Sequence, residues 1–467
     1  MQKILSIKNK DFCTGLAPYK NDARFGLLYS ANGYNPALKG GDIAFTKAPI
    51  DITGDVVKDQ IMGFCETTGT LFGIGSGGHL YKITDLGTTP VVYDIKSVTQ
   101  LTTPTQTIWT FQTTTGAADY IYYIHNGNYI GQLNNAGAVL SDTKFTLTHG
   151  NFGGGLLRID DEVYFGCSNY IHKMYDNVGT ADPSILEDVL DLPKGQAVSS
   201  ISTDGNYLII SATYDNTKTK IYFWDYKNNL DSWTYSYDIP DTLYSLKTKA
   251  GLTYAIGKRG IWVFSYANYP ILLREDLKST SVFSNMLEGF KDLVLINGQN
   301  TSTYSYGKVN NSFNNSLNCL ITGLNGYSRA SNFSANLSRG FISTTNSKLF
   351  YVDYETQKTA SSDTIITSYI NLQNIYNISR VDIIFQDKMA SGDAVGIRLR
   401  RTAGTTDGLD YQDFTSVSFA IQGAVSNAKS ITTNSLVGDC ISIELTISGT
   451  CVIKQIDIYG EPTERTN

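Results

Sequence analysis

The chain has 467 residues, and its 37 Lys and Arg against 43 Asp and Glu give a formal net charge of −6 at pH 7. General nucleic-acid binders carry a basic excess, so this balance disfavours a nucleic-acid partner. A hydrophobic fraction of 41% excludes global disorder. The 31 Tyr, 20 Phe and 42 Gly, with only 10 Pro, are typical of an all-β protein, because aromatic residues favour strands and Gly favours turns.

The N-terminal segment, residues 1–59, is predicted to complete part of the domain that follows it. Its first ten residues, MQKILSIKNK, lack the apolar stretch of a signal peptide, and no part of the sequence approaches the roughly 18 apolar residues of a membrane helix. We therefore expect a chain that folds in a cytoplasm and has no membrane partner. Within the segment, Arg24–Ser30 has β-strand character and is predicted to pair with the last of the repeats described next.

Seven β-hairpins are predicted between residues 60 and 358. Each combines an apolar strand, a short polar turn and a second strand rich in aromatic residues. The turns fall near residues 76, 126, 168, 215, 258, 299 and 345. Their mean spacing of about 45 residues is typical of β-propeller blades, which bury by radial stacking the faces that an isolated hairpin would expose. The repeat predicts a roughly seven-bladed β-propeller, with at most one short helical turn at Asp182–Leu192.

The sequence changes character after a polar stretch at residues 359–363. Residues 364–467 contain six or more short β-segments, with clear alternation in Ile441–Thr446. This spacing predicts a C-terminal antiparallel β-sandwich. On one of its strands Arg398 and Arg400 share a face, because side chains alternate along a strand. They are either a solvated strand face or a charged contact with a neighbouring subunit, and they are our candidate interface residues.

No motif in the sequence predicts catalysis, a cofactor or a metal ion. The acidic run Asp160–Glu162 is expected to be solvated, and Asp225–Asp231 lacks the Gly and Glu of a calcium loop. The glycine-rich Gly150–Gly155 is not followed by a predicted helix, so it is interpreted as a tight approach to a strand and not as a phosphate site. The four histidines have no metal-ligand spacing and are expected to be mostly solvated turn residues: His79, His125, His149 and His172.

The six cysteines are too few and too irregularly spaced for a disulfide framework, and we expect free thiols. If the last two strands formed a hairpin about Gly449-Thr450, Cys440 would lie opposite about Tyr459 and not opposite Cys451. Aromatic pairs such as Tyr122-Tyr123 and Trp224/Tyr226 could stack sugars, but packing between blades uses the same residues and is the preferred interpretation.

Several stretches of the chain resemble β-propeller virion proteins of tailed bacteriophages, including the nozzle-type proteins of short-tailed phages. They are Phe12–Leu16, Ala31–Pro36, Phe385–Val395 and the ending Ile456–Gly460. The resemblance implies a structural role in the tail or the portal-proximal machine, often in a ring of copies. It offers no catalytic residues.

These observations predict a non-enzymatic virion component, made and assembled in the bacterial host cytoplasm. Its expected partners are other virion proteins and copies of itself, bound through hairpin turns and blade connections. One alternative is a tail protein that binds a glycan or receptor on the host surface. A second is a propeller glycosidase, which a cluster of acids or arginines in the central channel would favour.

Overall fold

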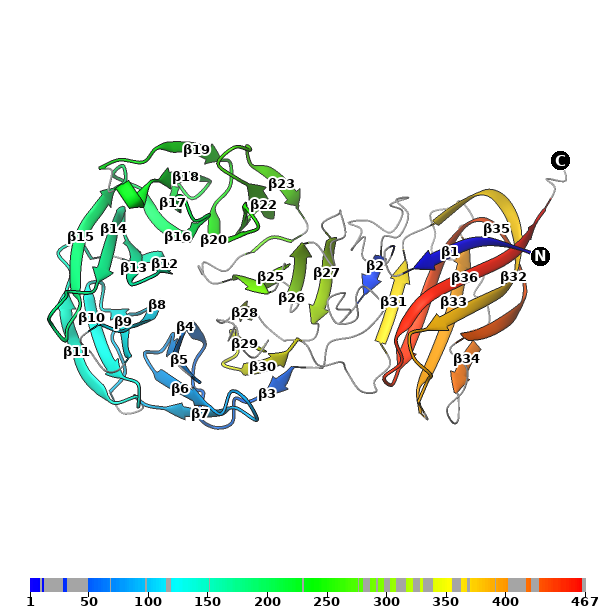
Figure 1. Cartoon of the computed structure of the whole chain (residues 1–467), viewed down its shortest axis with the longest axis horizontal. Helices are drawn as coiled ribbons and strands as arrows, with labels where there is room; N and C mark the ends of the chain where they lie inside the picture. Colours follow the sequence, from blue (N-terminus) through cyan, green and yellow to red (C-terminus); the bar gives the residue numbers. More distant parts are fainter. Residues whose placement is uncertain are drawn as a thin grey trace. The chain divides into compact units, whose positions relative to one another are not determined.

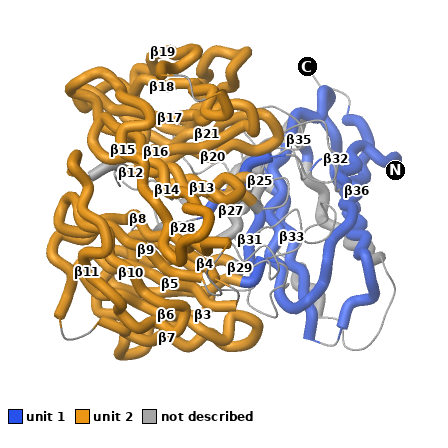
Figure 2. Tube along the Cα trace, turned by 60° about the vertical axis from the view of Figure 1, so that its left-hand side comes forward, with its two compact units in different colours: residues 1–48, 303–322, 353–467 blue, residues 49–302, 323–352 orange. Residues whose placement is uncertain are grey.

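The computed structural model divides the chain into two compact units (Figure 2). Unit 1 contains residues 1–48, 303–322 and 353–467, and unit 2 contains residues 49–302 and 323–352. The structure describes residues 1–8, 11, 28–31, 49–67, 69–96, 99–114, 119–150, 152–228, 231–275, 277–279, 286–290, 293–297, 303–307, 316–321, 328–330, 339–354, 363–367, 370–390, 392–401, 417–420 and 428–463. Nearly all regular structure in these ranges is β-strand, beside one short 3-10 helix at Tyr226–Asn228.

Seven four-stranded antiparallel sheets surround a central channel as the blades of a β-propeller (Figure 1). Blade 1 contains β4 (Ile61–Thr67), β5 (Thr70–Gly75), β6 (Leu80–Thr84) and β7 (Val91–Asp94). Blade 2 contains β8 (Pro104–Phe111), β9 (Tyr120–His125), β10 (Tyr129–Asn134) and β11 (Val139–Thr146). Blade 3 contains β12 (Phe152–Ile159), β13 (Glu162–Cys167), β14 (Tyr170–Tyr175) and β15 (Ser184–Asp191).

The remaining blades repeat this order of strands. Blade 4 contains β16 (Ala197–Thr203), β17 (Leu208–Tyr214), β18 (Lys218–Trp224) and β19 (Tyr235–Ile239). Blade 5 contains β20 (Leu243–Lys249), β21 (Leu252–Gly257), β22 (Ile261–Phe264) and β23 (Ile271–Arg274). Blade 6 contains β24 (Leu287–Phe290), β25 (Leu293–Asn297), β26 (Thr303–Gly307) and β27 (Ser316–Ile321), the last two within unit 1. Blade 7 contains β28 (Ser328–Ala330), β29 (Arg339–Thr344), β30 (Leu349–Asp353) and β3 (Ile50–Asp51).

The predicted hairpins are the second and third strands of the blades, so the propeller prediction is confirmed. The turns near residues 76, 126, 168, 215, 258 and 345 each join these two strands, and the turn near 299 lies outside the described residues. The segment Asp182–Leu192, for which at most one short helical turn was expected, contains no helix. Most of that segment is the outer strand β15, which hydrogen-bonds to β14 in the sheet.

A strand from the N-terminal segment closes the ring, but it is not the predicted one. Ile50 and Asp51 pair with β30, and Thr53 Oγ1 accepts a hydrogen bond from Leu349 N at 2.9 Å. Leu28–Ala31, which overlaps the predicted Arg24–Ser30, is instead β2 and pairs with a strand of unit 1. The apolar side chains of Ile50 and Ile52 explain the choice, because they pack against the core shared by blades 7 and 1.

The hydrophobic core of the propeller lies between neighbouring blades. Tyr123 is buried between blades 1 and 2, whereas its neighbour Tyr122 is buried between blades 2 and 3. Successive residues of one strand thus reach opposite faces of the blade, as strand alternation requires. Trp224 and Tyr226 fill the interface of blades 3 and 4. The aromatic pairs therefore pack between blades, as expected, and their abundance in the sequence follows from this repeated interface.

Glycines allow the innermost strands to approach one another. A Cβ atom on Gly63 of β4 would lie 2.0 Å from Gln106 O of β8. A Cβ atom on Gly154 of β12 would lie 2.2 Å from Ser199 O of β16, and Gly155 adopts a φ of +101° that disfavours other residues. The glycine-rich Gly150–Gly155 therefore serves close strand packing, in agreement with its interpretation as a tight approach to a strand.

Unit 1 contains an antiparallel β-sandwich with one continuous hydrogen-bonded sheet. Its strands are β1 (Gln2–Lys8), β2 (Leu28–Ala31), β31 (Asp363–Thr367), β32 (Ile370–Phe385), β33 (Ala394–Arg401), β34 (Val417–Ala420), β35 (Ala428–Ser448) and β36 (Ile453–Pro462). The order is β1-β36-β32-β35-β31-β2, and β33 pairs with both β35 and β34. The long strands β32 and β35 curve, and their register shifts twice (Figure 1). Both parts of the sheet contribute to one core, which contains Val381 and Ile458 as well as Ile397 and Ile443.

The hairpin about Gly449-Thr450, considered above only as a condition, does not form. Strand β36 pairs with β1 and β32 instead, and Cys440 of β35 lies opposite Asn371 of β32. The reason is burial, because the isoleucines of β35 and β36 face the same core from different parts of the sheet. The cysteines whose side chains the structure describes, Cys65, Cys167 and Cys451, are buried thiols.

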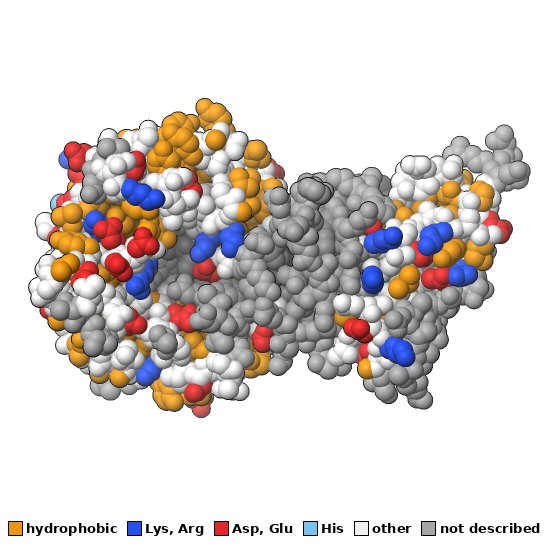
Figure 3. All heavy atoms as spheres, in the orientation of Figure 1, with side chains coloured by type: hydrophobic (Ala, Val, Ile, Leu, Met, Phe, Trp, Pro, Cys, Tyr) orange, Lys and Arg blue, Asp and Glu red, His pale blue; other side chains and the backbone are white. Residues whose placement is uncertain are grey.

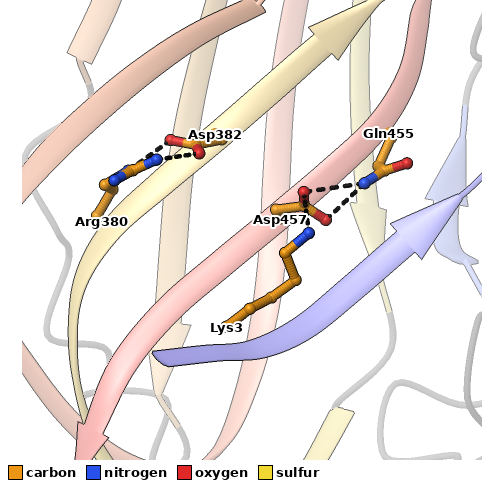
Figure 4. Close-up of polar contacts among 5 residues, drawn as sticks. All are labelled: Lys3, Arg380, Asp382, Gln455 and Asp457. Atoms are coloured by element: carbon orange, nitrogen blue, oxygen red, sulfur yellow. Dashed lines mark hydrogen bonds and ion pairs between the residues drawn. The ribbon is translucent and has the colours of Figure 1, made fainter. Parts of the chain in front are cut away.

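Polar contacts fix the N-terminal strand to the C-terminal one (Figure 4). Lys3 Nζ lies 2.7 Å from Asp457 Oδ2, and Gln455 Nε2 donates to both oxygens of the same carboxylate at 2.8 and 2.9 Å. Burial raises the pKa of Asp457, but the hydrogen bonds from Lys3 and Gln455 outweigh burial and hold this pKa below its usual value. The ionised carboxylate therefore contributes to the pairing of β1 with β36.

Candidate functional site

The central channel encloses a cavity of about 480 Å³. It is lined by the innermost strands of blades 1 to 6, and its charged residues are Glu66, Arg158, Lys247 and Glu288. Figure 3 shows basic and acidic side chains close together around this hollow. Lys247 Nζ lies 2.8 Å from Glu288 Oε1, and this neighbouring charge raises the pKa of Lys247. Among the described lining residues, an ion pair thus engages one of the two acids, Glu288.

Three of the four histidines are not solvated turn residues, contrary to the prediction, whereas the side chain of His149 is 40% exposed. His79 Nδ1 lies 2.8 Å from Asp94 Oδ2, His125 Nε2 lies 2.7 Å from the carbonyl oxygen of Asp142, and His172 is completely buried. In each case the ring reaches from the central hairpin of a blade to its outer strand. The sequence signal was available, since each histidine precedes an acidic residue of the next outer strand by 15 to 17 positions.

The candidate interface residues lie on β33. Arg398 is opposite Glu444 of β35, with 3.6 Å between Nη1 and Oε1, and its side chain is one-third exposed. Arg400 is opposite Ser442 in the same register, and its side chain lies outside the described part of the structure. Leu399 between them is buried in the sandwich core. The backbone therefore places both arginines on one face, but Glu444 offsets the charge of Arg398.

The outermost strands of four blades carry exposed apolar side chains that sequence analysis missed. They belong to β7, β11, β15 and β23, and each is between 38% and 63% exposed: Val91, Tyr93, Val139, Leu140, Leu186 and Ile271. In β7 the alternation is complete, because Val92 between two exposed residues is buried. Figure 3 shows hydrophobic side chains at the outer edge of the propeller, around β19 and β23. The sequence signal that could have predicted these exposed side chains is the presence of apolar residues on both faces of an outer strand.

Four tyrosines form a partly exposed aromatic surface on blades 4 and 5. The rings of Tyr207 and Tyr266 are nearly parallel, with an interplanar angle of 3° and 4.8 Å between centroids. Tyr235 packs edge-on against Tyr266 at 5.6 Å, and Tyr269 is 75% exposed. These four residues, called the tyrosine surface below, combine partly exposed rings with hydroxyl groups, a chemistry suited to proteins and to sugars.

Comparisons with known proteins assign this chain to no family. No family model and no curated protein matches the chain. Similar solved structures include Raptor of Chaetomium thermophilum, with 11% identity and a TM-score of 0.46 over 67% of this chain and 29% of that one. The WD40 domain of Neurospora crassa Pan2 has 8% identity and a TM-score of 0.43 over 67% and 95% of the two chains. YCF48 bound to D1 peptide has 11% identity and a TM-score of 0.46 over 69% and 97%.

Among the described residues there is no helix with both the length and the apolar character needed to span a membrane.

Proposed function

We propose that this chain is a non-enzymatic assembly protein that binds other proteins, including copies of itself, through the outer circumference of its propeller. The observation that supports the proposal is the set of exposed apolar side chains on β7, β11, β15 and β23. These strands are the outer edges of their sheets, so one side of each backbone is left without a partner strand in its own blade.

Exposed apolar edge strands are unusual because they favour pairing with another chain. Folded proteins usually protect such strands with Lys, Pro or a covering segment. Here Val91 and Tyr93 project from β7, and Val139 and Leu140 project from β11. An exposed apolar surface with unpaired backbone groups is the physical signature of a protein-binding edge.

The proposed setting is the virion of a tailed bacteriophage, assembled in the bacterial host cytoplasm. The support for this setting is the resemblance at Phe12–Leu16, Ala31–Pro36, Phe385–Val395 and Ile456–Gly460. In that setting the partners are other virion proteins and further copies of this chain in a ring. Repeated contacts around a ring act together, so individually weak edges suffice for stable assembly.

The experiment replaces apolar edge residues by lysine in the full chain. In the variant Tyr93→Lys with Leu140→Lys, we expect the abundance of the chain in purified particles to fall at least tenfold, and self-association in solution to fall with it. The matched control is Thr143→Lys, which adds a charge at an exposed polar position of β11. Quantitative mass spectrometry of particles and light scattering of the pure protein give the two readouts. Wild-type incorporation of the double variant would contradict the proposal.

The tyrosine surface favours a second candidate function, binding of a glycan on the host surface. Sugar rings stack on aromatic side chains. Burial, the hydroxyl group of Tyr266 and the nearby acids Asp225 and Asp204 raise the pKa of Tyr207, so the surface also has acidic neighbours. A glycan array separates this function from pure assembly. If it holds, Tyr266→Ala with Tyr269→Ala abolishes the array signal, whereas Tyr93→Ala, an exposed tyrosine of blade 1, retains it.

A further inference from the structure

His149, Glu187 and Asp188 bring one imidazole and two carboxylates together at the outer side of blade 3. One potential ligand atom from each residue lies within 4.8 Å of the other two. His149 belongs to the connection between β11 and β12, whereas both acids belong to β15. His149 Nδ1 is 2.9 Å from Asp188 Oδ2, and Glu187 accepts a hydrogen bond from Thr148 N at 2.8 Å.

An irregularity in β15 makes this convergence possible. In a regular strand the consecutive side chains of Glu187 and Asp188 would point to opposite faces. The pairing of β14 with β15 shifts register between Ile171 and Lys173, and Asp188 adopts a φ of 55°. Bulges of this kind redirect a side chain. Both carboxylates therefore face the same connection, on which His149 lies.

One carboxylate oxygen of this cluster is enclosed and lacks a donor. Among the described residues, Asp188 Oδ1 has no hydrogen-bond partner. The completely buried His172 places Nδ1 3.7 Å from it. Asp188 N donates to this Nδ1 at 3.1 Å, so Nδ1 presents a lone pair and the ring proton is on Nε2.

A cation bound near Asp188 Oδ1 would therefore be favourable. An enclosed carboxylate oxygen that faces a lone pair is unfavourable unless a positive charge satisfies it. His149 Nδ1 also makes no well-oriented hydrogen bond, although Asp188 is close.

We propose that His149, Glu187 and Asp188 bind a divalent transition-metal ion. A set of one imidazole nitrogen and two carboxylates suits Zn²⁺ and its neighbours, whereas Ca²⁺ and Mg²⁺ prefer oxygen ligands alone. The ion bridges the connection between blades 2 and 3 to the outer strand of blade 3. It thereby stabilises the folded state by binding to it and not to the unfolded chain.

The test uses the full chain without a polyhistidine tag, freed of metal by a chelator. Titration calorimetry with Zn²⁺ is expected to show about one ion per chain, with a higher melting temperature in its presence, and Ca²⁺ at the same concentration is expected to give neither effect. His149→Gln and, separately, Glu187→Gln should weaken Zn²⁺ binding at least tenfold. The matched control is His79→Gln, because His79 faces a single carboxylate, that of Asp94, and should leave Zn²⁺ affinity unchanged.

Three results would overturn the proposal: no Zn²⁺ binding by the wild-type chain, equal binding of Ca²⁺, or unchanged Zn²⁺ affinity in both His149→Gln and Glu187→Gln. Circular dichroism of each variant verifies folding before titration. If His149→Gln fails to fold, Glu187→Gln decides alone, because Glu187 is partly exposed.

Discussion

In the propeller, apart from the ring-closing strand β3, strands that are neighbours in sequence are neighbours in space, and each core is shared by consecutive blades. In the sandwich, β1 pairs with β36, and Lys3 meets a carboxylate 454 positions away. The two units use the same kind of strand, with alternating buried and exposed residues. The units differ in the distance along the chain between paired strands. The short distances in the propeller produce a sequence repeat, and the long ones in the sandwich do not. We therefore expect a substitution to destabilise mainly the unit that contains it.

The largest expected effect is the loss of an aromatic residue between two blades. Trp224 is 1% exposed and packs against blade 3, with Tyr164 edge-on at 6.0 Å. Trp224→Ala should lower the free energy of unfolding by about 3–5 kcal/mol, the usual cost of deleting a buried aromatic side chain. Denaturant titration measures the loss. Hydrogen exchange should place it in blades 3 and 4, and uniform loss of protection across both units would contradict the independence of the two cores.

A smaller, complementary effect is expected when the N-terminal strand loses a core side chain. Ile7 of β1 is 1% exposed in the sandwich core. Ile7→Ala should cost about 2–4 kcal/mol and should release the peptides of β36 to exchange while those of blades 1 to 5 stay protected. Ile271→Ala, at an exposed position of β23, is the control and should be nearly neutral.

Acid should weaken one ion pair in each region. In the propeller, Asp142 is buried in part, which raises its pKa, but Lys96 and Tyr123 donate hydrogen bonds that outweigh burial and lower the pKa. Asp457 in the sandwich behaves in the same way. A lowered folded-state pKa gives stability that is present above the unfolded value of about 4 and is lost as pH falls through the folded value. Asp457→Asn should make the stability of the sandwich less dependent on pH between 5 and 2.5, without changing that of the propeller. Hydrogen exchange measured over this pH range tests it. In this variant, a changed pH dependence of exchange in blade 2 would contradict the prediction.

The smallest effect on stability is expected for the two candidate interface arginines. Arg398 is partly exposed beside Glu444, so Arg398→Glu with Arg400→Glu should cost within about 1 kcal/mol. If the arginines contact an acidic partner, incorporation into particles falls although the fold is retained. Particle abundance and titre in a complementation assay report this, and wild-type values for both would identify a solvated strand face.

The sequence was informative where structure is local and repeated. The hairpin turns near residues 76, 126, 168, 215, 258 and 345 were predicted because each repeat places an apolar strand before a polar turn. The ring-closing strand was not, because Ile50-Asp51 is two residues long and less β-like than Leu28–Ser30. The pairing of Cys440 with Asn371 was missed since it depends on a long curved strand. The cluster at His149 and Asp188 depends on a bulge, which no spacing rule encodes.

Strands β1 and β3, both near the start of the chain, have different consequences for folding during synthesis. β3 is already made when β30 emerges, since Thr53 and Leu349 are 296 positions apart, so the ring of blades can close while translation continues. β1 must wait for β36. At about 5–20 residues per second, the 454 positions between Lys3 and Asp457 correspond to roughly 20 to 90 s of elongation. Throughout that interval β1 lacks its partner strand, whereas β3 can pair with β30 before β36 is made.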